Sequence, residues 1–370
     1  MTEPFKNKYN AEVIAIMGDH LKRVWPEFDT IGFGNMCRDG LEALELKERI
    51  ARISEALNEF LPQDDFDFAV SVMQESLAPY GADWEQGVTG WGTLPFNHYA
   101  STYGLKHFDT SMAFFRETTS HFSAEFDIRF FLLHYPKCTL ELLHKWVNDP
   151  NYHVRRLVSE GTRPRLPWAM KLQPFIDDPS PILPLLETLR DDQEGYVRRS
   201  VANNLNDIAK DHPDLVASIA KEWLKGADKN RESLVKHACR TLIKKGHKPT
   251  LEALGYADPE VVLEVLSIKT PKVEFGGALV FEVTLHSKSG KPQNLIIDYA
   301  IHHRKANGSA LPKVFKWKNM ALKANDVLSA AKKHVIKPIT TRTYYNGTHS
   351  VEIFVNGVSL GKQDFELHGI

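Results

Sequence analysis

The run VRRLVSEGTRPRLPW, residues 154–168, combines acidic, basic and aromatic side chains in a pattern that is unusual for a surface helix. It contains one carboxylate, Glu160, and it ends on Leu-Pro-Trp with the indole of Trp168. A planar guanidinium matches the oxygens of a phosphate or a carboxylate, so clustered arginines suit an anion. The run therefore predicts a surface that binds an anion and holds one negative charge at a chosen point. Its four arginines are Arg155, Arg156, Arg163 and Arg165.

The same pattern recurs along the chain. NDPNYHVRRLVSEG (148–161) aligns with RDDQEGYVRRSVANN (190–204) at a shift of 43 residues, and weaker copies are NRESLVKHACRTL (230–242) and AEFDIRFFLLH (124–134). A period near 40 with paired helices is the signature of HEAT-like repeats, which stack into a solenoid with a concave binding surface. In the first copy, the residues at the i, i+3, i+4 and i+7 spacing of a buried helical stripe are Val154, Leu157, Val158 and Gly161.

A polar stripe accompanies the buried stripe in each copy. Arg156 and Glu160 form an i, i+4 pair on another face of the first helix. The ordinary interpretation is a solvated ridge of helix salt bridges, phosphate binding is the second, and acidic protein partners are the third. Trp168 likewise has an ordinary interpretation as a core residue. The corresponding positions of the later copies are Arg199, Asn203, Asp207, His237, Thr241 and Lys245, while Arg198 aligns with Arg155.

The hydrophobic pattern of the sequence changes at Val261, where helical spacing is replaced by alternation of apolar and polar residues. ALVFEVTLH and SVEIFVNGVSLG are examples, and turn signals such as Asn356-Gly357 separate the runs. About seven short strands over roughly 105 residues favour a β-sandwich of immunoglobulin type. We therefore predict a HEAT-like α-helical solenoid at 1–258 and an immunoglobulin-like β-sandwich at 259–370. Residues 84–105, rich in glycine and aromatics, are expected to form a long loop.

Charge divides at the same place. From Val261 onward there are 15 Lys+Arg and 8 Asp+Glu, a net of +7, which leaves −8 before it in a chain whose formal net charge is −1. Basic segments with interleaved aromatics, HHRKANG (302–308) and KVFKWKN (313–319), favour contact with DNA, and a merely soluble basic face is the alternative. The candidate DNA-binding residues here are Arg304, Lys305, Lys316 and Lys318.

Several function classes are disfavoured by composition. The 370 residues exceed one ordinary core, and no run of 18 apolar residues predicts a membrane span. The N-terminus lacks the pattern of a secretory signal, so we expect a cytoplasmic protein. Cys37, Cys138 and Cys239 are far apart, which favours a reducing compartment over disulfides or zinc. No metal site and no phosphate-binding glycine loop is evident, so neither a metal nor a cofactor is expected.

Two long motifs carry a family resemblance. HFSAEFDIRFFL (121–132), together with VRRLVSEGTRPRLPW, resembles the AlkC group of bacterial DNA alkylation-repair glycosylases, which relate to the AlkD group through HEAT-like repeats. The match covers essentially the whole chain, including the immunoglobulin-like tail that some AlkC proteins carry. One departure is visible, because proline is expected after Ile-Arg in the first motif and this chain has Phe130.

The resemblance implies excision of N3-methyladenine and N3-methylcytosine from duplex DNA without a conventional base-flipping pocket. These bases are cationic, and cleavage of their N-glycosidic bonds builds positive charge on the deoxyribose. On that basis Glu160 is expected to face the developing cation or position the water, and Trp168 to offer an aromatic face. Glu125 is a second carboxylate candidate, with a helix-start charge beside Ser123 as its alternative, and Asp207 is a third.

Two other functions stay open at this point. One is a non-catalytic HEAT-repeat scaffold that binds nucleic acid, and the other is a protein–protein adaptor whose sandwich binds a partner. Glu160 and Trp168 favour the enzyme, because neither is needed merely to hold phosphate. No lysine stands out as a Schiff-base nucleophile, so a monofunctional enzyme without lyase activity is expected. We expect the protein to act as a monomer on duplex DNA.

Overall fold

The structure is a computed structural model that describes residues 3–340 and 342–370. It divides into two compact units, Met1–Asp211 and His212–Ile370, each of which is described by itself. The change from helix to strand falls between Ala253 and Val261, so the predicted order of a helical region followed by a β-sandwich is confirmed. The predicted domain boundary at 258/259 stays a prediction, because the last helices pack in the same unit as the strands.

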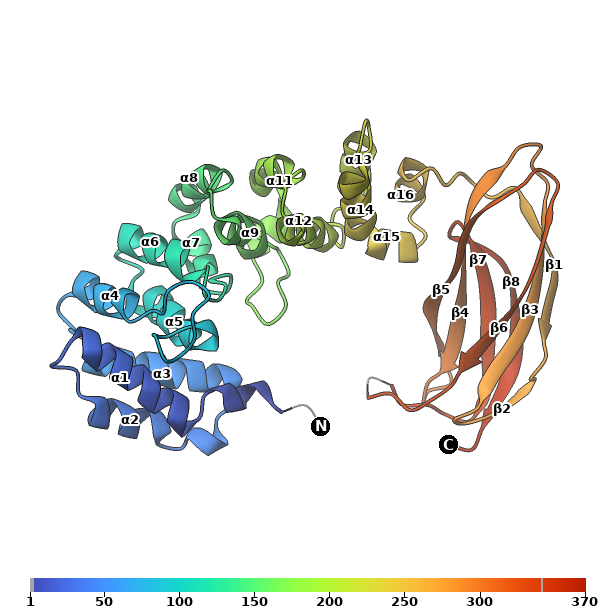
Figure 1. Cartoon of the computed structure of the whole chain (residues 1–370). Coiled ribbons are helices and arrows are strands. Elements are labelled where there is room, and N and C mark those ends of the chain that lie inside the picture. Colours follow the sequence, from blue (N-terminus) through green and yellow to red (C-terminus); the bar gives the residue numbers. More distant parts are fainter. Residues whose placement is uncertain (1–2, 341) are drawn as a thin grey trace. The chain divides into compact units, whose positions relative to one another are not determined.

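The first unit is built from stacked helices (Figure 1). In Figure 1, α8 and α11 lie in one row and α7, α9 and α12 lie in a second row, as expected for repeated helix pairs. The elements of this unit are η1 (Phe5–Lys8), α1 (Ala11–Val24), α2 (Thr30–Arg38), η2 (Leu41–Ala43), α3 (Leu46–Phe60), α4 (Phe66–Glu75), η3 (Gly90–Gly92), α5 (Thr93–Tyr103), α6 (Phe108–Thr118), α7 (Ile128–His134), α8 (Pro136–Trp146), α9 (Tyr152–Gly161), α10 (Gln173–Asp177), η4 (Ser180–Ile182), α11 (Leu183–Leu189) and α12 (Gly195–Ile208).

The sequence repeat corresponds to the second row of helices. The four aligned copies fall on α7, α9, α12 and α14 (Lys229–Ala238), the last of which lies in the second unit. On α9 the predicted stripe is buried, with Val154, Leu157 and Val158 at most 1% exposed. Gly161 closes the stripe because a Cβ there would lie 2.6 Å from Ile128 Cγ2, too close for any side chain. The helix begins after Asn151, whose side chain accepts from the His153 amide.

The prediction of a long loop at 84–105 is wrong for the second half of that segment. Residues 93–103 form α5, a helix buried in the first unit between α3 and α6. Phe96 and Ala100 are fully buried and Tyr99 is 3% exposed. Burial on most sides hides the one-sided spacing that identifies a surface helix, so tertiary packing outweighs the glycine-rich flank.

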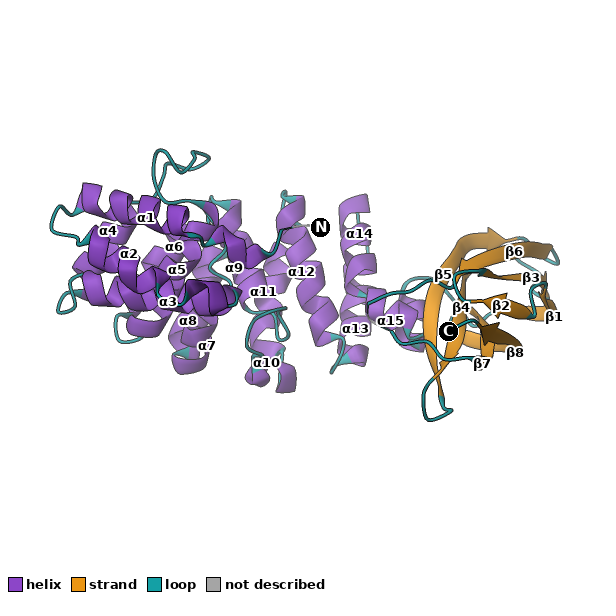
Figure 2. Cartoon of the chain, turned by 90° about the horizontal axis from the view of Figure 1, so that it is seen from below, coloured by secondary structure: helices purple, strands orange, loops and turns teal. Residues whose placement is uncertain are grey.

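The second unit contains four helices and eight strands among its described residues (Figure 2). The strands form a three-stranded sheet of order β1-β3-β6 and a five-stranded sheet of order β2-β8-β7-β4-β5. A core that includes Phe281, Ile301 and Ile353 lies between them. The elements are α13 (Pro213–Trp223), α14 (Lys229–Ala238), α15 (Arg240–Lys244), α16 (Lys248–Ala253), β1 (Val261–Ile268), β2 (Lys272–Glu274), β3 (Ala278–Ser287), β4 (Gln293–Arg304), β5 (Ala310–Leu322), β6 (Val327–Val335), β7 (Gly347–Val355) and β8 (Val358–His368).

The helices of the second unit pack closely against its sandwich at one point. The predicted Asn356-Gly357 turn connects β7 to β8 with φ values of 46° and 78°. A Cβ on Gly246 would lie 2.7 Å from the Gly357 Cα, so two backbones meet where neither residue has a side chain. Asn356 Nδ2 also donates to the Ala257 carbonyl at 2.8 Å. Among the described residues of the chain, no helix has the length and apolar composition to cross a bilayer.

Candidate active site

A cavity of about 720 Å³ opens in the first unit at the face that carries the two sequence motifs. Its wall comes from α3, from the loop before α7, from α9, and from the loop that follows α9. The volume is in the range of small-molecule sites. The sequence-predicted residues that line this cavity are Glu125, Arg156, Glu160, Arg163 and Trp168.

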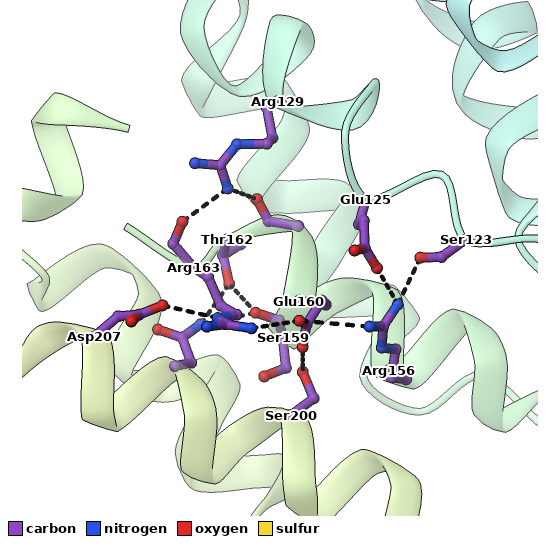
Figure 3. Close-up of polar contacts among 12 residues, drawn as sticks. Ser123, Glu125, Arg129, Arg156, Ser159, Glu160, Thr162, Arg163, Ser200 and Asp207 are labelled. Carbon is purple, nitrogen blue, oxygen red and sulfur yellow. Dashed lines mark hydrogen bonds and ion pairs between the residues drawn. The ribbon is translucent and has the colours of Figure 1, made fainter. Parts of the chain in front are cut away.

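Glu160 is held on both oxygens (Figure 3). Its Oε1 accepts from Arg163 Nη1 at 2.6 Å and lies 3.4 Å from Arg156 Nη2. Its Oε2 accepts from the Ser200 hydroxyl at 2.6 Å, which comes from α12 in the next repeat. The side chain is only 6% exposed. The predicted lone carboxylate is therefore a fixed negative charge in the cavity wall, at the contact between two repeats.

Arg156 bridges the two candidate carboxylates. Its Nη1 donates to Glu125 Oε2 and to the Ser123 hydroxyl, the latter at 2.6 Å (Figure 3). Its guanidinium carbon lies 5.0 Å from the centre of the Tyr196 ring, a cation–π contact. Burial lowers the pKa of Arg156, but Glu125 and Glu160 raise it by more, so the net pKa is raised and the side chain stays charged. On α9 the polar pair of Arg156 and Glu160 is thus largely buried at a repeat contact, which contradicts the interpretation of a solvated ridge for this helix.

Arg163 links Glu160 to Asp207, the third candidate carboxylate. Its Nε donates to Asp207 Oδ2 at 2.8 Å, while Lys210 Nζ donates to Oδ1 at 2.8 Å. Asp207 is 2% exposed and does not line the cavity. It holds Arg163 from behind, so the geometry gives it a supporting position, and its catalytic role stays a prediction.

Arg129 fixes the loop after α9 from inside the protein. This fully buried side chain donates through Nη1 to the carbonyls of Gly161 and Arg163, at 2.9 and 2.7 Å, and through Nε to the Met170 carbonyl at 3.0 Å. Burial, reinforced by the charge of Arg163, lowers the pKa of Arg129 to about 10. One bond occupies the Gly161 carbonyl at the end of α9 and the others hold carbonyls of the following loop, so one side chain restrains residues 161–170.

Trp168 stands out of that loop rather than in the core. It is 60% exposed, and its φ of 65° lies in the left-handed region that non-glycine residues rarely adopt. Lys47 Nζ donates to its carbonyl oxygen, and the indole lines the cavity. An exposed aromatic ring at a strained backbone position is typical of functional sites, so the interpretation as a core residue is wrong.

Asp127 is a third carboxyl group in the cavity wall, beside Glu125 and Glu160, and the sequence did not single it out. It is 4% exposed, and the Ser101 hydroxyl donates to its Oδ1 at 2.8 Å. Burial raises the pKa of Asp127, the Ser101 bond opposes the shift and the Glu125 charge adds to it, so that the resulting pKa is about 7. Near neutral pH this group therefore changes its charge close to Glu125.

The other predicted DNA-binding arginines of the first unit are mostly engaged in the fold. Arg155 is 8% exposed, and it donates to both Asp192 oxygens and to the Asp149 carbonyl. Arg165 forms a two-bond pair with Asp211. Arg198 donates to the Asp192 carbonyl, whereas Arg199 is exposed and Asn203 half-buried on α12. The burial of Arg155 and its pair with Asp192 give it a structural position, and its predicted role in DNA binding stays a prediction.

The remaining candidates lie in the second unit. His237 is half-buried on α14. The four basic residues predicted from charge division are exposed, two at the end of β4 and in the following turn and two on β5. Among the described residues, no group of three or more His, Cys, Asp or Glu side chains could hold a metal ion. The exposed basic residues are Arg304, Lys305, Lys316 and Lys318.

The site also contains residues that the sequence analysis did not identify. Arg129 lies within the first quoted motif, so the motif itself was the signal for its importance. Asp127 lies in the same motif, but the sequence did not mark it because its partner Ser101 is distant along the chain. Ser200 carried no signal, because its partner Glu160 lies 40 positions away. Neither did the aromatic residues beside Trp168, which come from distant segments. The residues missed are Phe5, Lys47, Trp91, Phe122, Asp127, Arg129, His153, Tyr196 and Ser200.

Known proteins resemble this chain over nearly its full length. A family model described as the C-terminal Ig-like domain of the uncharacterised protein YhaZ matches residues 262–369. The uncharacterized protein YhaZ of Bacillus subtilis (strain 168) is 36% identical over 364 residues, which are 98% of this chain and 99% of that protein. The predicted immunoglobulin-like class of the sandwich is thereby confirmed.

A solved structure shares the whole fold. It is the Pseudomonas fluorescens alkylpurine DNA glycosylase AlkC bound to DNA containing an abasic site analog. The match has a TM-score of 0.89 at 36% sequence identity, and it covers 99% of this chain and 100% of that chain. Identity and coverage of this size confirm the resemblance found in the two motifs, and the chain belongs to the AlkC family, together with YhaZ.

Proposed function

We propose that this chain is a monofunctional DNA glycosylase of base excision repair. It hydrolyses the N-glycosidic bond of cationic alkylated bases, N3-methyladenine and N3-methylcytosine, in duplex DNA without conventional base flipping. The observation that carries the proposal is the pair of carboxylates, Glu125 and Glu160, fixed by Arg156 in the wall of one cavity that also carries Trp168. Membership of a family whose solved member is an alkylpurine DNA glycosylase supports it.

The chemistry suits this arrangement. A cationic base is already a good leaving group, so the enzyme needs little acid catalysis. Departure of the base builds positive charge on the sugar, which fixed carboxylates stabilise electrostatically. Such preorganised charge contributes on the order of a few kcal/mol. Three donors surround Glu160, whereas Arg156 is the partner of Glu125 among the described residues, so Glu125 is the carboxylate better placed to accept a water proton.

The exposed groups supply contacts to DNA. Trp168 offers an aromatic face to a cationic base or sugar. The exposed lysines of β5 and the basic turn after β4 attract the phosphate backbone without reading its sequence. Duplex DNA with alkylated bases is thus the proposed partner, and we further propose that the protein acts as a monomer in the cytoplasm.

The test is release of methylated bases by the purified protein. Duplex DNA treated with a methylating agent is incubated with excess protein, and released bases are separated by chromatography. We expect N3-methyladenine and N3-methylcytosine to be released, with little action on uracil or hypoxanthine, because the fixed carboxylates Glu125 and Glu160 favour a leaving base that already carries positive charge. Glu125→Gln is the matched control for contaminating activity.

Two outcomes would change the conclusion. Binding of duplex DNA with no base release would favour the non-catalytic nucleic-acid scaffold. Efficient excision of uracil or hypoxanthine would contradict the restriction to cationic lesions, since neutral bases need a proton donor at the leaving group.

A further inference from the structure

A row of four aromatic rings connects the start of the chain to Trp168. Phe5 stacks on Trp91, with centroids 5.4 Å apart and planes at 22°, and it meets the Trp168 ring edge-on at 6.1 Å. Trp91 contacts Phe122 at 5.0 Å. The rings come from η1, from η3, from the loop before α7 and from the loop after α9. Four segments that are distant in sequence therefore meet at one side of the cavity.

The segment that carries Phe5 is anchored by a buried arginine. Arg49, on α3, is 2% exposed, and its Nη1 donates to the carbonyls of Lys6 and Tyr9 at 3.2 and 2.8 Å. The Tyr9 hydroxyl donates to the Trp91 carbonyl at 2.7 Å. The backbone around η1 is therefore fixed, so the half-exposed ring of Phe5 keeps its place although solvent reaches it.

Trp168 depends on such support. A left-handed backbone is unfavourable for a residue with a Cβ, so the surrounding contacts must hold it. The bonds from Lys47 and Arg129 restrain the backbone of the loop, but they leave the indole free to change rotamer. Among the described residues, the aromatic ring recorded against this indole is that of Phe5.

We propose that Phe5 is a positioning residue that holds the Trp168 indole at the cavity wall. The proposal rests on the proposed function, since the indole is the group that meets the lesion. Phe5 itself does not line the cavity, so it acts through Trp168. A ring that is ordered before DNA arrives loses no rotamer freedom on binding, and it meets the reacting sugar in one geometry.

A double-mutant cycle in the full chain tests the proposal. Single-turnover release of N3-methyladenine is measured against protein concentration for Phe5→Ala, Trp168→Ala and the double variant. We expect Phe5→Ala to lower the rate at saturating protein about tenfold, which corresponds to about 1.4 kcal/mol, and Phe5→Tyr to restore it. In the Trp168→Ala background, Phe5→Ala should change the rate less than about twofold, because coupled residues are not additive.

A matched control separates positioning from general loss of surface packing. Phe68, on α4, is also a half-exposed phenylalanine that meets a tryptophan edge-on, Trp25 at 6.2 Å, and it does not line the cavity. Phe68→Ala should keep the wild-type rate. The proposal is overturned if Phe5→Ala keeps the wild-type rate, or if its tenfold loss persists when Trp168 is absent.

A spectroscopic measurement keeps the proposal testable even without activity. The emission of Trp168 is isolated as the difference between the wild-type protein and Trp168→Phe, and the same subtraction is made in the Phe5→Ala background. Loss of Phe5 should make Trp168 more accessible to acrylamide and shift its emission, while the melting temperature stays close to wild type. Unchanged quenching would overturn the proposal. If the wild type releases no base, the proposed function fails and this measurement still decides whether Phe5 positions Trp168.

Discussion

The arginines around α9 and the lysines of β5 are both basic clusters, but the structure gives them opposite environments. Arg155 and Arg163 are less than a tenth exposed, and each is paired with a carboxylate. Lys316 and Lys318 are exposed, and neither has a hydrogen bond or ion pair among the described residues. A cluster of arginines in sequence therefore does not by itself predict phosphate contacts. Here much of the cluster holds the site together, and the exposed lysines remain for the DNA backbone.

A large effect is expected at Asp127, a buried carboxyl group whose hydrogen-bond partner is a serine rather than an arginine. Its pKa of about 7 in the folded protein exceeds the ordinary 3.8, so the folded state keeps a proton that the unfolded chain releases. The stability that this proton provides is complete below about pH 4 and is lost as pH rises to about 7, by up to about 4 kcal/mol. Asp127→Asn should therefore be more stable than wild type at pH 8 and equal to it at pH 4.

Urea unfolding at pH 4, 6 and 8 measures this difference. Asp64→Asn, at an exposed carboxylate, is the control and should follow the wild type at each pH. An Asp127→Asn variant that gains nothing at pH 8 would show that the carboxyl group is ionised and stabilised in the folded protein.

The next prediction concerns the loss of stability when a buried ion pair is broken. Arg155→Ala leaves Asp192 without its guanidinium, and removing one partner of a buried pair costs roughly 3–5 kcal/mol. Lys225→Ala, at an exposed pair with Glu222, should cost less than about 1 kcal/mol. Urea unfolding measures both, and the salt dependence of DNA binding should be unchanged in Arg155→Ala. A weaker salt dependence with normal stability would make Arg155 a phosphate contact after all.

Substitution of the two site carboxylates should affect activity and stability differently. Glu125→Gln should slow base release about a hundredfold, or about 2.7 kcal/mol, with near-normal stability and DNA binding. Glu160→Gln should lose a comparable rate and also stability, because Arg163 and Ser200 donate to its oxygens in a buried position. Single-turnover kinetics and urea unfolding measure the two effects. Full activity in both variants would refute these roles and make Asp207 the next candidate.

The smallest effect belongs to the exposed lysines. Lys316→Gln combined with Lys318→Gln should leave stability within about 0.5 kcal/mol. If each lysine neutralises one phosphate, the slope of log affinity against log salt should fall by about 1.8. Fluorescence anisotropy with a duplex between 50 and 200 mM salt measures the slope. Equal slopes for the variant and the wild type would remove β5 from the DNA contact.

Local pattern predicted most of the fold. The stripe of α9 and the alternation of β3 follow from spacing alone, because each element buries one face. The turn at Asn356-Gly357 follows from residue type, since both positions need positive φ. The helix α5 was missed because it is buried on most sides and therefore shows little one-sided pattern.

The candidate site was predicted only in part. Glu160, Arg156 and Trp168 share one run, so the sequence already placed them close together. Their environment could not be predicted, because the Ser200 bond to Glu160 spans 40 positions and the Arg129 bond to Met170 spans 41. The same holds for the burial that raises the pKa of Asp127. The sequence shows which side chains are present, whereas the packing of the repeats determines which hydrogen-bond and ion-pair partners those side chains have.

The junction at Gly246 and Gly357 limits how the sandwich can be inherited. A sandwich transferred to another protein by recombination at the end of the helices would leave behind the segment against which its β7–β8 turn packs. A cut at Val261, where the strands begin, would also separate the Asn356 amide from the Ala257 carbonyl and Asn319 from the Tyr256 hydroxyl. No residue smaller than glycine exists to relieve a poor fit at this contact. Exchange of this sandwich between proteins should therefore carry α13–α16 with it, and the unit of descent is larger than the strands alone.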